Sequence, residues 1–307
     1  MRCSVPIAAV FAAGAFALPA RVQPRADSDG HSHDTTPWDE GATKDFWIHD
    51  SCNATETTQL RKGLADAVTL ADHAKQHILR FGNSSEHYRK YFGDAPSAEA
   101  IGNYERVVSG DRGNALFRCD NPDGNCNQPE WGGHWRGSNA TNETVICPLS
   151  YSTRRPLEQL CALGYTVAGS ETNTYFGSDL LHRLYHMPAF GEDHVEHFAE
   201  GYAGALELAE TNSSYATHDS DILQYFALDV YAYDIAVPGV GCAGTVDETA
   251  SSMETPTSTA STTSTSAQSP SSFVTEPPTP VTAGAANGVT SAPQDCHTHA
   301  GGDVHCV

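Results

Sequence analysis

Two histidines stand four residues apart in the segment Ser178–Pro188, whose sequence is SDLLHRLYHMP. On a helix, this spacing places His182 and His186 on one face, one turn apart, where both imidazoles can bind the same zinc ion. Zinc peptidases that use this spacing carry a glutamate directly after the first histidine as the general base. Here Arg183 occupies that position, and a guanidinium cannot accept a proton from metal-bound water. The segment therefore predicts metal binding and argues against peptide hydrolysis.

A third ligand is expected from the chain that follows this helix, because an exchangeable or catalytic zinc site has three protein ligands and an open position. Pro188 and Gly191 predict a turn that ends the helix and folds the next segment back onto the metal. His197 is the best candidate in that segment. The other candidates are His194, Glu196 and Glu200. The two glutamates are also the nearby side chains that could replace the missing base in an active enzyme.

Further histidines could bind metal elsewhere in the chain. In the C-terminal tail, three histidines stand between two cysteines, and we interpret this tail as an auxiliary zinc-binding segment formed by Cys296, His297, His299, His305 and Cys306. His73 and His77 form another pair at helical spacing, off the apolar stripe. Because no third ligand is evident nearby, we favour a solvated helix face there over a second zinc site. His134 lies in an aromatic, glycine-rich loop, where it is either a ligand or part of a packed turn.

Composition divides the 307 residues into five segments. Residues 1–20 are expected to be a secretory signal peptide, since a short basic start precedes an apolar run that is too short to span a bilayer. Residues 21–37 form a polar, flexible arm, and residues 38–244 form the folded body. Residues 245–293 are rich in Ser, Thr and Pro and predict a disordered linker. Residues 294–307 form the Cys/His tail, and no other apolar run predicts a membrane span.

Charge and cysteine content indicate the kind of protein. The net charge is -21, with 38 acidic and 17 basic residues, which argues against nucleic-acid binding. Eight of the nine cysteines remain once Cys3 leaves with the signal peptide, and an even number predicts disulfides. We expect Cys119 and Cys126 to pair and Cys242 to anchor the end of the body. Acceptor triplets for N-glycosylation stand at Asn53, Asn83, Asn139, Asn142 and Asn212. These features predict a secreted, extracellular protein, with retention at the cell surface or wall as an alternative.

The elements that must position the histidines are predicted to be mainly helical, in a disulfide-stabilised α+β body with a small antiparallel sheet. A long helix is expected from Asn53, which caps it together with Glu56, to Gly82. Short strands are expected at Arg106–Val108, Ala115–Phe117 and Thr144–Ile146. The helix with the histidine pair should begin between Ser170 and Ser178. Two more helices are expected, one with His194 and His197 in its first turn and one from Asp219 or Ser220 to Pro238.

On its motifs, the chain resembles a known family. The matching stretches are His73–Arg80, Phe117–Cys126, Trp131–Arg136, Val167–Thr174, His182–His186 and Cys296–His299. From Trp38 to Gly244 and in the tail, the sequence resembles the fungal secreted His-Arg-x-x-His proteins of the pH-regulated antigen and major allergen type, known as zincophores. That family is more distantly similar to the deuterolysin-type zinc metallopeptidases, whose downstream ligand is an aspartate. His197 falls at the aspartate position.

The resemblance implies a zincin-like metallopeptidase fold with Zn²⁺ on His182, His186 and His197. It also implies a zincophore, which captures extracellular zinc for uptake through a plasma-membrane zinc importer and also binds host plasma proteins. Arg183 in the base position predicts a protein that holds zinc without hydrolysing peptides. Its side chain could pair with Glu196 or Glu200, hold an anion at the open zinc position, or lie on the surface. The alternative functions are an active secreted zinc endopeptidase with a non-standard base, and an adhesin or immune-evasion protein with structural zinc.

Overall fold

The computed structural model of this chain describes residues 37–245, 296–298 and 304–306. The predicted signal peptide, nearly all of the arm and of the linker, and His299 lie outside the described residues. The chain divides into two units, Met1–Glu40 and Gly41–Val307, and every element described below belongs to the second. In the tail, strands β5 (Cys296–Thr298) and β6 (Val304–Cys306) pair antiparallel. Their register places the Cα atoms of His297 and His305 opposite each other.

The longest helix, α1 (Ala54–Phe81), forms as the sequence predicts. At its start, the Asn53 side chain accepts from the backbone N–H groups of Thr55 and Glu56, while the Glu56 carboxylate accepts from the Asn53 N–H. At its end, Gly82 adopts a φ of 55°, a conformation that favours glycine. Its predicted apolar stripe is buried, and comprises Leu60, Leu64, Ala67, Ala71 and Ile78. This helix forms one wall of the core.

The helix with the histidine pair, α5 (Phe176–Tyr185), packs directly against α1 and is buried along its whole length. Two glycines permit the close approach of the two helices. A Cβ atom on Gly63 would lie 2.7 Å from Leu180 Cδ1, and a Cβ atom on Gly177 would lie 2.6 Å from Asp66 Cβ. Since real Cβ atoms do not approach that closely, both positions favour glycine. The close packing holds α5 fixed in the core.

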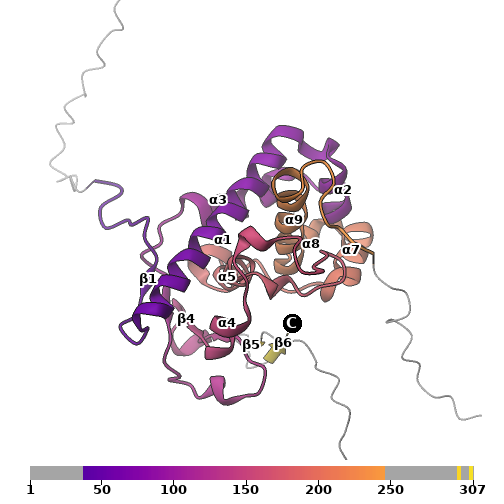
Figure 1. Cartoon of the computed structure of the whole chain (residues 1–307). Helices are drawn as coiled ribbons and strands as arrows, with labels where there is room; N and C mark the ends of the chain where they lie inside the picture. The colour runs from indigo at the N-terminus through magenta and orange to yellow at the C-terminus, as the bar shows by residue number, and fades with distance from the viewer. Residues whose placement is uncertain (1–36, 246–295, 299–303, 307) are drawn as a thin grey trace, which may run out of the picture. The chain divides into compact units, whose positions relative to one another are not determined.

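The remaining helices complete a mainly helical body, as predicted. Figure 1 shows α2, α7, α8 and α9 gathered near the C-terminal end of α1, with the sheet near its other end. These helices are α2 (Glu86–Phe92), α3 (Ser97–Ser109), α4 (Pro148–Thr153), α7 (Gly201–Thr211), α8 (Ser213–Ala216) and α9 (Ser220–Tyr231). A short π-helix, Ala232–Ala236, continues α9. Within the described residues, no helix is both long and apolar enough to cross a membrane.

The strand predicted at Arg106–Val108 is wrong, because these residues belong to α3. Ala100, Tyr104 and Val107 are buried at helical spacing, and α3 packs this face against α1. Packing of the helical stripe therefore overrides the β-propensity of two adjacent valines.

The sheet is small, as predicted, but it is mixed rather than antiparallel. Its four strands follow the order β1 (Trp47–Ile48), β2 (Leu116–Arg118), β4 (Glu143–Ile146) and β3 (Gly133–Trp135). The β1–β2 and β2–β4 pairs are parallel, and only β3–β4 is antiparallel. Parallel neighbours need long connections, and the helices α1 to α3 supply the one between β1 and β2. Strand β3 and its His134 belong to the aromatic, glycine-rich segment, where the sequence pattern predicts no strand.

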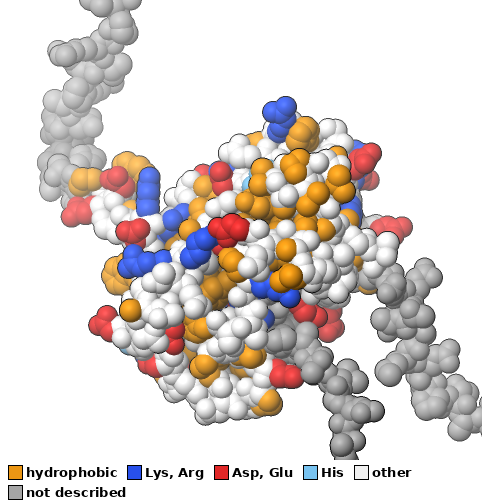
Figure 2. Space-filling model, in the orientation of Figure 1, with side chains coloured by type: hydrophobic (Ala, Val, Ile, Leu, Met, Phe, Trp, Pro, Cys, Tyr) orange, Lys and Arg blue, Asp and Glu red, His pale blue; other side chains and the backbone are white. Residues whose placement is uncertain are grey.

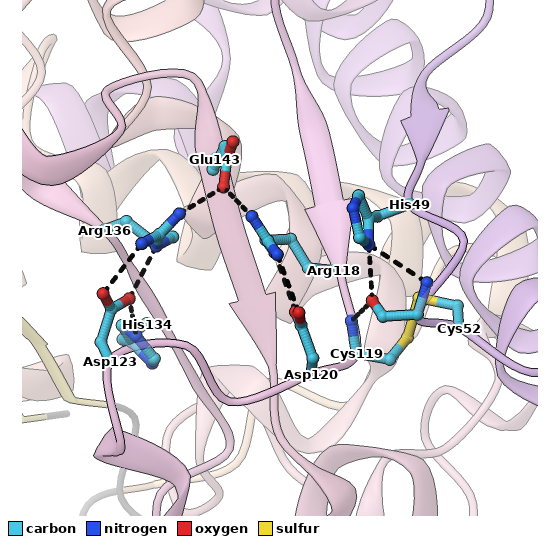
Figure 3. Close-up of polar contacts among 10 residues, drawn as sticks. His49, Cys52, Arg118, Cys119, Asp120, Asp123, His134, Arg136 and Glu143 are labelled. Atoms are coloured by element: carbon cyan, nitrogen blue, oxygen red, sulfur yellow. Dashed lines mark hydrogen bonds and ion pairs between the residues drawn. A yellow bond between two sulfur atoms is a disulfide. The ribbon is translucent and has the colours of Figure 1, made fainter.

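Three disulfides stabilise the body, as expected, although one predicted pair is wrong. The bonds are Cys52–Cys119, Cys126–Cys147 and Cys161–Cys242. Cys119 follows β2 and reaches Cys52 after β1, because these strands are parallel neighbours (Figure 3). Cys126 therefore forms its disulfide with Cys147, which follows β4. The prediction that Cys242 anchors the end of the body is confirmed by its bond to Cys161. Disulfides of this kind are typical of proteins that fold in an oxidising compartment.

The charged residues are mixed over the visible surface. On the face shown in Figure 2, Lys and Arg side chains lie scattered among Asp and Glu side chains rather than forming a continuous basic area.

Candidate metal centre

The three histidines predicted as ligands come together. His182 lies on α5, His186 caps its C-terminus, and His197 lies in the segment after the one-turn helix α6 (Pro188–Gly191). The Nε2 atoms of His182 and His186 are 3.0 Å apart, and those of His186 and His197 are 3.2 Å apart. Two nitrogens bound to one tetrahedral zinc are separated by about 3.4 Å. The three imidazoles therefore have the spacing of a shared metal site.

His182 is oriented by a glutamine on α9. Its Nδ1 lies 3.2 Å from Gln224 Oε1, while Gln224 Nε2 donates to the Ser178 carbonyl at 2.8 Å. Because the amide nitrogen is used on Ser178, its oxygen accepts from the His182 Nδ1–H. This tautomer leaves Nε2 with a lone pair directed at the other two histidines, as ligand histidines require.

His197 has a buried carboxylate behind it. Its Nδ1 lies 3.3 Å from Asp221 Oδ1 and 3.2 Å from Ser220 Oγ. Burial raises the pKa of the Asp221 carboxyl, but His197 and His182 outweigh that effect and hold the pKa below its ordinary value. Asp221 is therefore a carboxylate that favours protonation of Nδ1 and leaves Nε2 for a metal.

A tight turn delivers the His197 segment to the pair. After α6, Glu192 and Asp193 both adopt positive φ angles, of 55° and 53°. Gly191 is required at the start of this turn, because a Cβ atom there would lie 1.8 Å from the Tyr185 carbonyl oxygen. The predicted turn after Pro188 is thus present, and two strained residues follow it.

The start of α9 then holds the segment in place. Glu196 and Asp219 form an isolated parallel bridge. One oxygen of Asp219 accepts from the N–H groups of Phe198 and Ala199 at 2.7 and 2.9 Å, and the other caps α9 through the Ile222 N–H.

The prediction that His194 and His197 lie in the first turn of a helix is therefore wrong. The backbone N–H groups of Glu196, Phe198 and Ala199 bond to residues 218–219, and α7 begins only at Gly201.

Arg183 is buried and paired, which excludes the surface position considered as one alternative. Only 3% of its surface is exposed, and its Nε lies 2.7 Å from Oδ1 of Asp179, which is fully buried. The second oxygen of Asp179 lies 3.2 Å from Arg154 Nε. The guanidinium also passes close over β3, where a Cβ atom on Gly133 would lie 2.9 Å from Arg183 Nη1. The residue that replaces the base thus forms a structural ion pair with Asp179.

A cavity of about 240 Å³ lies beside the histidines, and His186 lines it. Glu196 and Trp135 also line this cavity, whereas Glu200 is not among its lining residues. Of the two glutamates considered as substitute bases, Glu196 is therefore the one that shares a cavity with His186. His194, the remaining candidate ligand, contacts Glu99 instead, at 2.9 Å.

His134 is a packed residue rather than an open ligand. It is 1% exposed, and its Nε2 lies 3.1 Å from Asp123 Oδ2. Figure 3 shows that Asp123 belongs to a line of alternating charges across the sheet. Arg136 bridges Asp123 and Glu143, and Arg118 bridges Glu143 and Asp120. Burial lowers the pKa of His134, so the neutral imidazole is favoured in the folded protein.

The interpretation of His73 and His77 as a solvated face is wrong. His77 is 6% exposed, and its two nitrogens lie 2.8 Å from Asp234 Oδ2 and 2.8 Å from Ser85 Oγ. His73 Nε2 lies 3.0 Å from the same Asp234 oxygen. Asp234 belongs to the π-helix, more than 150 residues further along the chain. The pair therefore attaches α1 to the end of α9.

The glycosylation acceptors meet a simple requirement. The five asparagines predicted to carry glycans are all exposed: Asn53, Asn83, Asn139, Asn142 and Asn212. Their modification stays a prediction. The auxiliary ligands of the tail, Cys296, His297, His299, His305 and Cys306, also stay a prediction, because their side chains lie outside the described part of the molecule.

Sequence reasoning missed Gln224 and Asp221 on α9 and Asp219 at its N-cap, which support the histidines. The sequence did contain an indication, since polar residues interrupt a helix that is otherwise apolar. In the structure all three side chains are buried. A polar residue on a buried helix face needs a partner. The partner itself, more than twenty residues away, could not be read from the pattern.

The chain is similar to several known proteins. Residues 4–245 match the family model described as "HRXXH: Putative peptidase family". The chain is 56% identical over 270 residues to major allergen Asp f 2 of Aspergillus fumigatus. This match covers 88% of this chain and 87% of that protein. It is 47% identical over 236 residues to the pH-regulated antigen PRA1 of Candida albicans. This match covers 76% of this chain and 78% of that protein. A zinc peptidase from Grifola frondosa, a solved structure, matches 58% of this chain and 97% of its own, with 16% identity and a TM-score of 0.43. The chain belongs to the HRXXH family.

Proposed function

We propose that this protein is a secreted zincophore, which captures extracellular Zn²⁺ with His182, His186 and His197 and releases it for cellular uptake. One observation carries the proposal: three imidazole Nε2 atoms converge at metal-ligand spacing, while the residue in the base position is buried against Asp179. The polar contacts of Gln224 support the ligand role of His182, since they direct its Nε2 toward the other two histidines. Zinc is the cargo of this site.

An exchangeable site must let its ion leave. Three protein ligands leave a fourth position for water or for a ligand from a receiving protein. We expect the cavity lined by His186 to offer access to that position. Because only neutral imidazole binds zinc, affinity should fall as the pH drops below about 6.5.

Delivery and location are further parts of the proposal. The expected receiver is a plasma-membrane zinc importer, and host plasma proteins are expected as additional partners, both from the family resemblance. Secretion is supported by three disulfides and by five exposed acceptor asparagines. The names of the relatives, an allergen and an antigen, agree with an extracellular location.

An active zinc endopeptidase is the second candidate, and one observation favours it. Glu196 lines the cavity beside His186, so its carboxylate could serve as a general base if it reached a zinc-bound water. The buried ion pair of Arg183 speaks against this function, because the position that normally supplies the base is occupied by a cation.

The test compares two matched variants. His182→Asn removes the Nε2 ligand but keeps an amide that can donate to Gln224, whereas His87→Asn alters a histidine outside the triad that contacts Asp229. Zinc content after dialysis against a zinc buffer should fall in His182→Asn and stay unchanged in His87→Asn. The zinc-loaded protein should leave a diverse peptide library intact. Equal zinc content in all proteins, or zinc binding that is unchanged at about pH 5, would contradict the zincophore.

Cleavage of the library would decide for the peptidase. The zinc-loaded protein would have to cleave the library. This cleavage would have to be lost in His182→Asn, in Glu196→Gln and after removal of zinc.

A further inference from the structure

A second cluster of potential ligands lies outside the histidine triad. Glu99 projects from α3, His194 from the segment after α6, and His218 from the residues that precede α9. Glu99 Oε1 lies 2.9 Å from His194 Nε2, and Glu99 Oε2 lies 3.3 Å from His218 Nδ1. One ligand atom from each of the three lies within 4.8 Å of the others. Two imidazole nitrogens and one carboxylate form a donor set that zinc binds in proteins.

The two histidine rings are held in a defined arrangement. The rings of His194 and His218 stack with centroids 4.1 Å apart and an angle of 23° between their planes. Both present a nitrogen to the same carboxylate. Thr217 Oγ1 donates to Glu99 Oε2, and such a hydrogen bond fixes the orientation of a ligand carboxylate. Little rearrangement is therefore needed to bring the three donors onto one ion.

The cluster is more exposed to solvent than His182 and His197 of the triad. The side chains of His194, Glu99 and His218 are 54%, 40% and 12% exposed. Those of His182 and His197 are 6% and 3% exposed. An ion at the cluster would keep at least one water-facing position and could exchange directly with the medium.

We propose that Glu99, His194 and His218 form a second, solvent-exposed zinc site. The site joins α3, the segment after α6 and the residues before α9 through one ion. The same two segments carry and hold His197, because the Glu196 N–H donates to the His218 carbonyl at 3.1 Å. Zinc at the outer site therefore fastens the segment that supplies the third histidine of the inner site, a consequence that rests on the proposed function.

The test uses the full-length protein with conservative variants. Glu99→Gln keeps an acceptor for Thr217 and removes the carboxylate, and His194→Gln removes an exposed ligand at little cost to folding. Glu105→Gln is the matched control, since it lies on the same helix and pairs with Lys75 away from the cluster. Each protein is equilibrated in the same zinc buffer, and bound zinc is measured per chain. Thermal unfolding in EDTA checks that the variants are folded.

We expect Glu99→Gln and His194→Gln each to bind one zinc ion per chain fewer than the wild type and Glu105→Gln. Equal zinc content in all four proteins would overturn the outer site. The same measurement in a His182→Asn background separates the two sites. If Glu99→Gln still loses one ion there, the outer site is independent of the triad. If His182→Asn alone loses no zinc, the proposed function fails while the outer site stands.

Discussion

The buried pair of Arg183 and Asp179 permits the sharpest test of how the base position is used. Arg183→Met removes the cation and leaves a fully buried carboxylate. Removal of one partner from a buried ion pair costs about 3–5 kcal/mol, because the other charge stays behind. Since Arg154 remains 3.2 Å from Asp179, we expect a loss near the lower end, about 3 kcal/mol. That is a large share of a total stability of about 5–15 kcal/mol.

A double-mutant cycle isolates the pair from the rest of the core. The cycle combines Arg183→Met, Asp179→Asn and the double variant, and urea unfolding of zinc-free protein with intact disulfides gives the free energies of unfolding. We expect the double variant to lose less than the sum of the two single variants, with a coupling energy of about 2 kcal/mol.

Zinc binding supplies the second measurement of this experiment. All three variants of the cycle should bind zinc with nearly unchanged affinity, because the contacts of Gln224 and Asp221 to the histidines are not altered. A coupling energy below about 0.5 kcal/mol would refute the idea that Arg183 acts through Asp179. A loss of zinc that parallels the loss of stability would refute the separation of the ion pair from the metal site.

The support of His182, the packing at Gly133 and the burial of His134 can each be tested by substitution. Gln224→Leu should weaken zinc binding about 10–100-fold, measured by chelator competition, because His182 loses its acceptor; Gln76→Leu, on the outer face of α1, should leave it unchanged. Gly133→Ala should destabilise the protein by about 1–3 kcal/mol in urea unfolding, since the new Cβ would lie 2.4 Å from a backbone oxygen, whereas Gly102→Ala has open space around it and should stabilise α3. Burial lowers the pKa of His134, so its contribution to stability is present above about pH 6.5 and is lost as the pH falls through the lowered pKa. His134→Gln should therefore reduce the loss of stability of zinc-free protein between about pH 6.5 and pH 5, and an equal loss in both proteins would contradict this assignment.

The parts of the fold that were predicted correctly depend on local sequence. Helix α1 has its cap, its stripe and its terminating glycine within one continuous segment, and all three could be read directly. The pair His182 and His186 is equally local, because the helix alone sets their separation. The pairing of Asp179 with Arg183 was also readable, since residues four apart face each other on a helix. The partners expected for Arg183 were instead Glu196, Glu200 or an anion at the zinc, with a surface position as the alternative.

The parts that were predicted wrongly depend on contacts between distant segments. The sheet is parallel at β2 because helices connect β1 to β2, and this choice of neighbours also decides that Cys119 bonds to Cys52. The backbone of the His197 segment takes its partners from residues 218–219, so its extended form cannot follow from its own periodicity. His77 likewise reads as solvated until the π-helix brings Asp234 to it.

The arrangement of α5 explains how the proposed zinc site is compatible with an arginine in the base position. Adjacent residues on a helix point about 100° apart, so His182 and Arg183 leave α5 in different directions. The imidazole reaches the α9 side, where Gln224 orients it, and the guanidinium reaches Asp179 and strand β3. A change at position 183 can therefore exchange a general base for a core ion pair without moving a ligand. The same separation implies that restoring a glutamate there would cost the ion pair and place two buried carboxylates one helical turn apart.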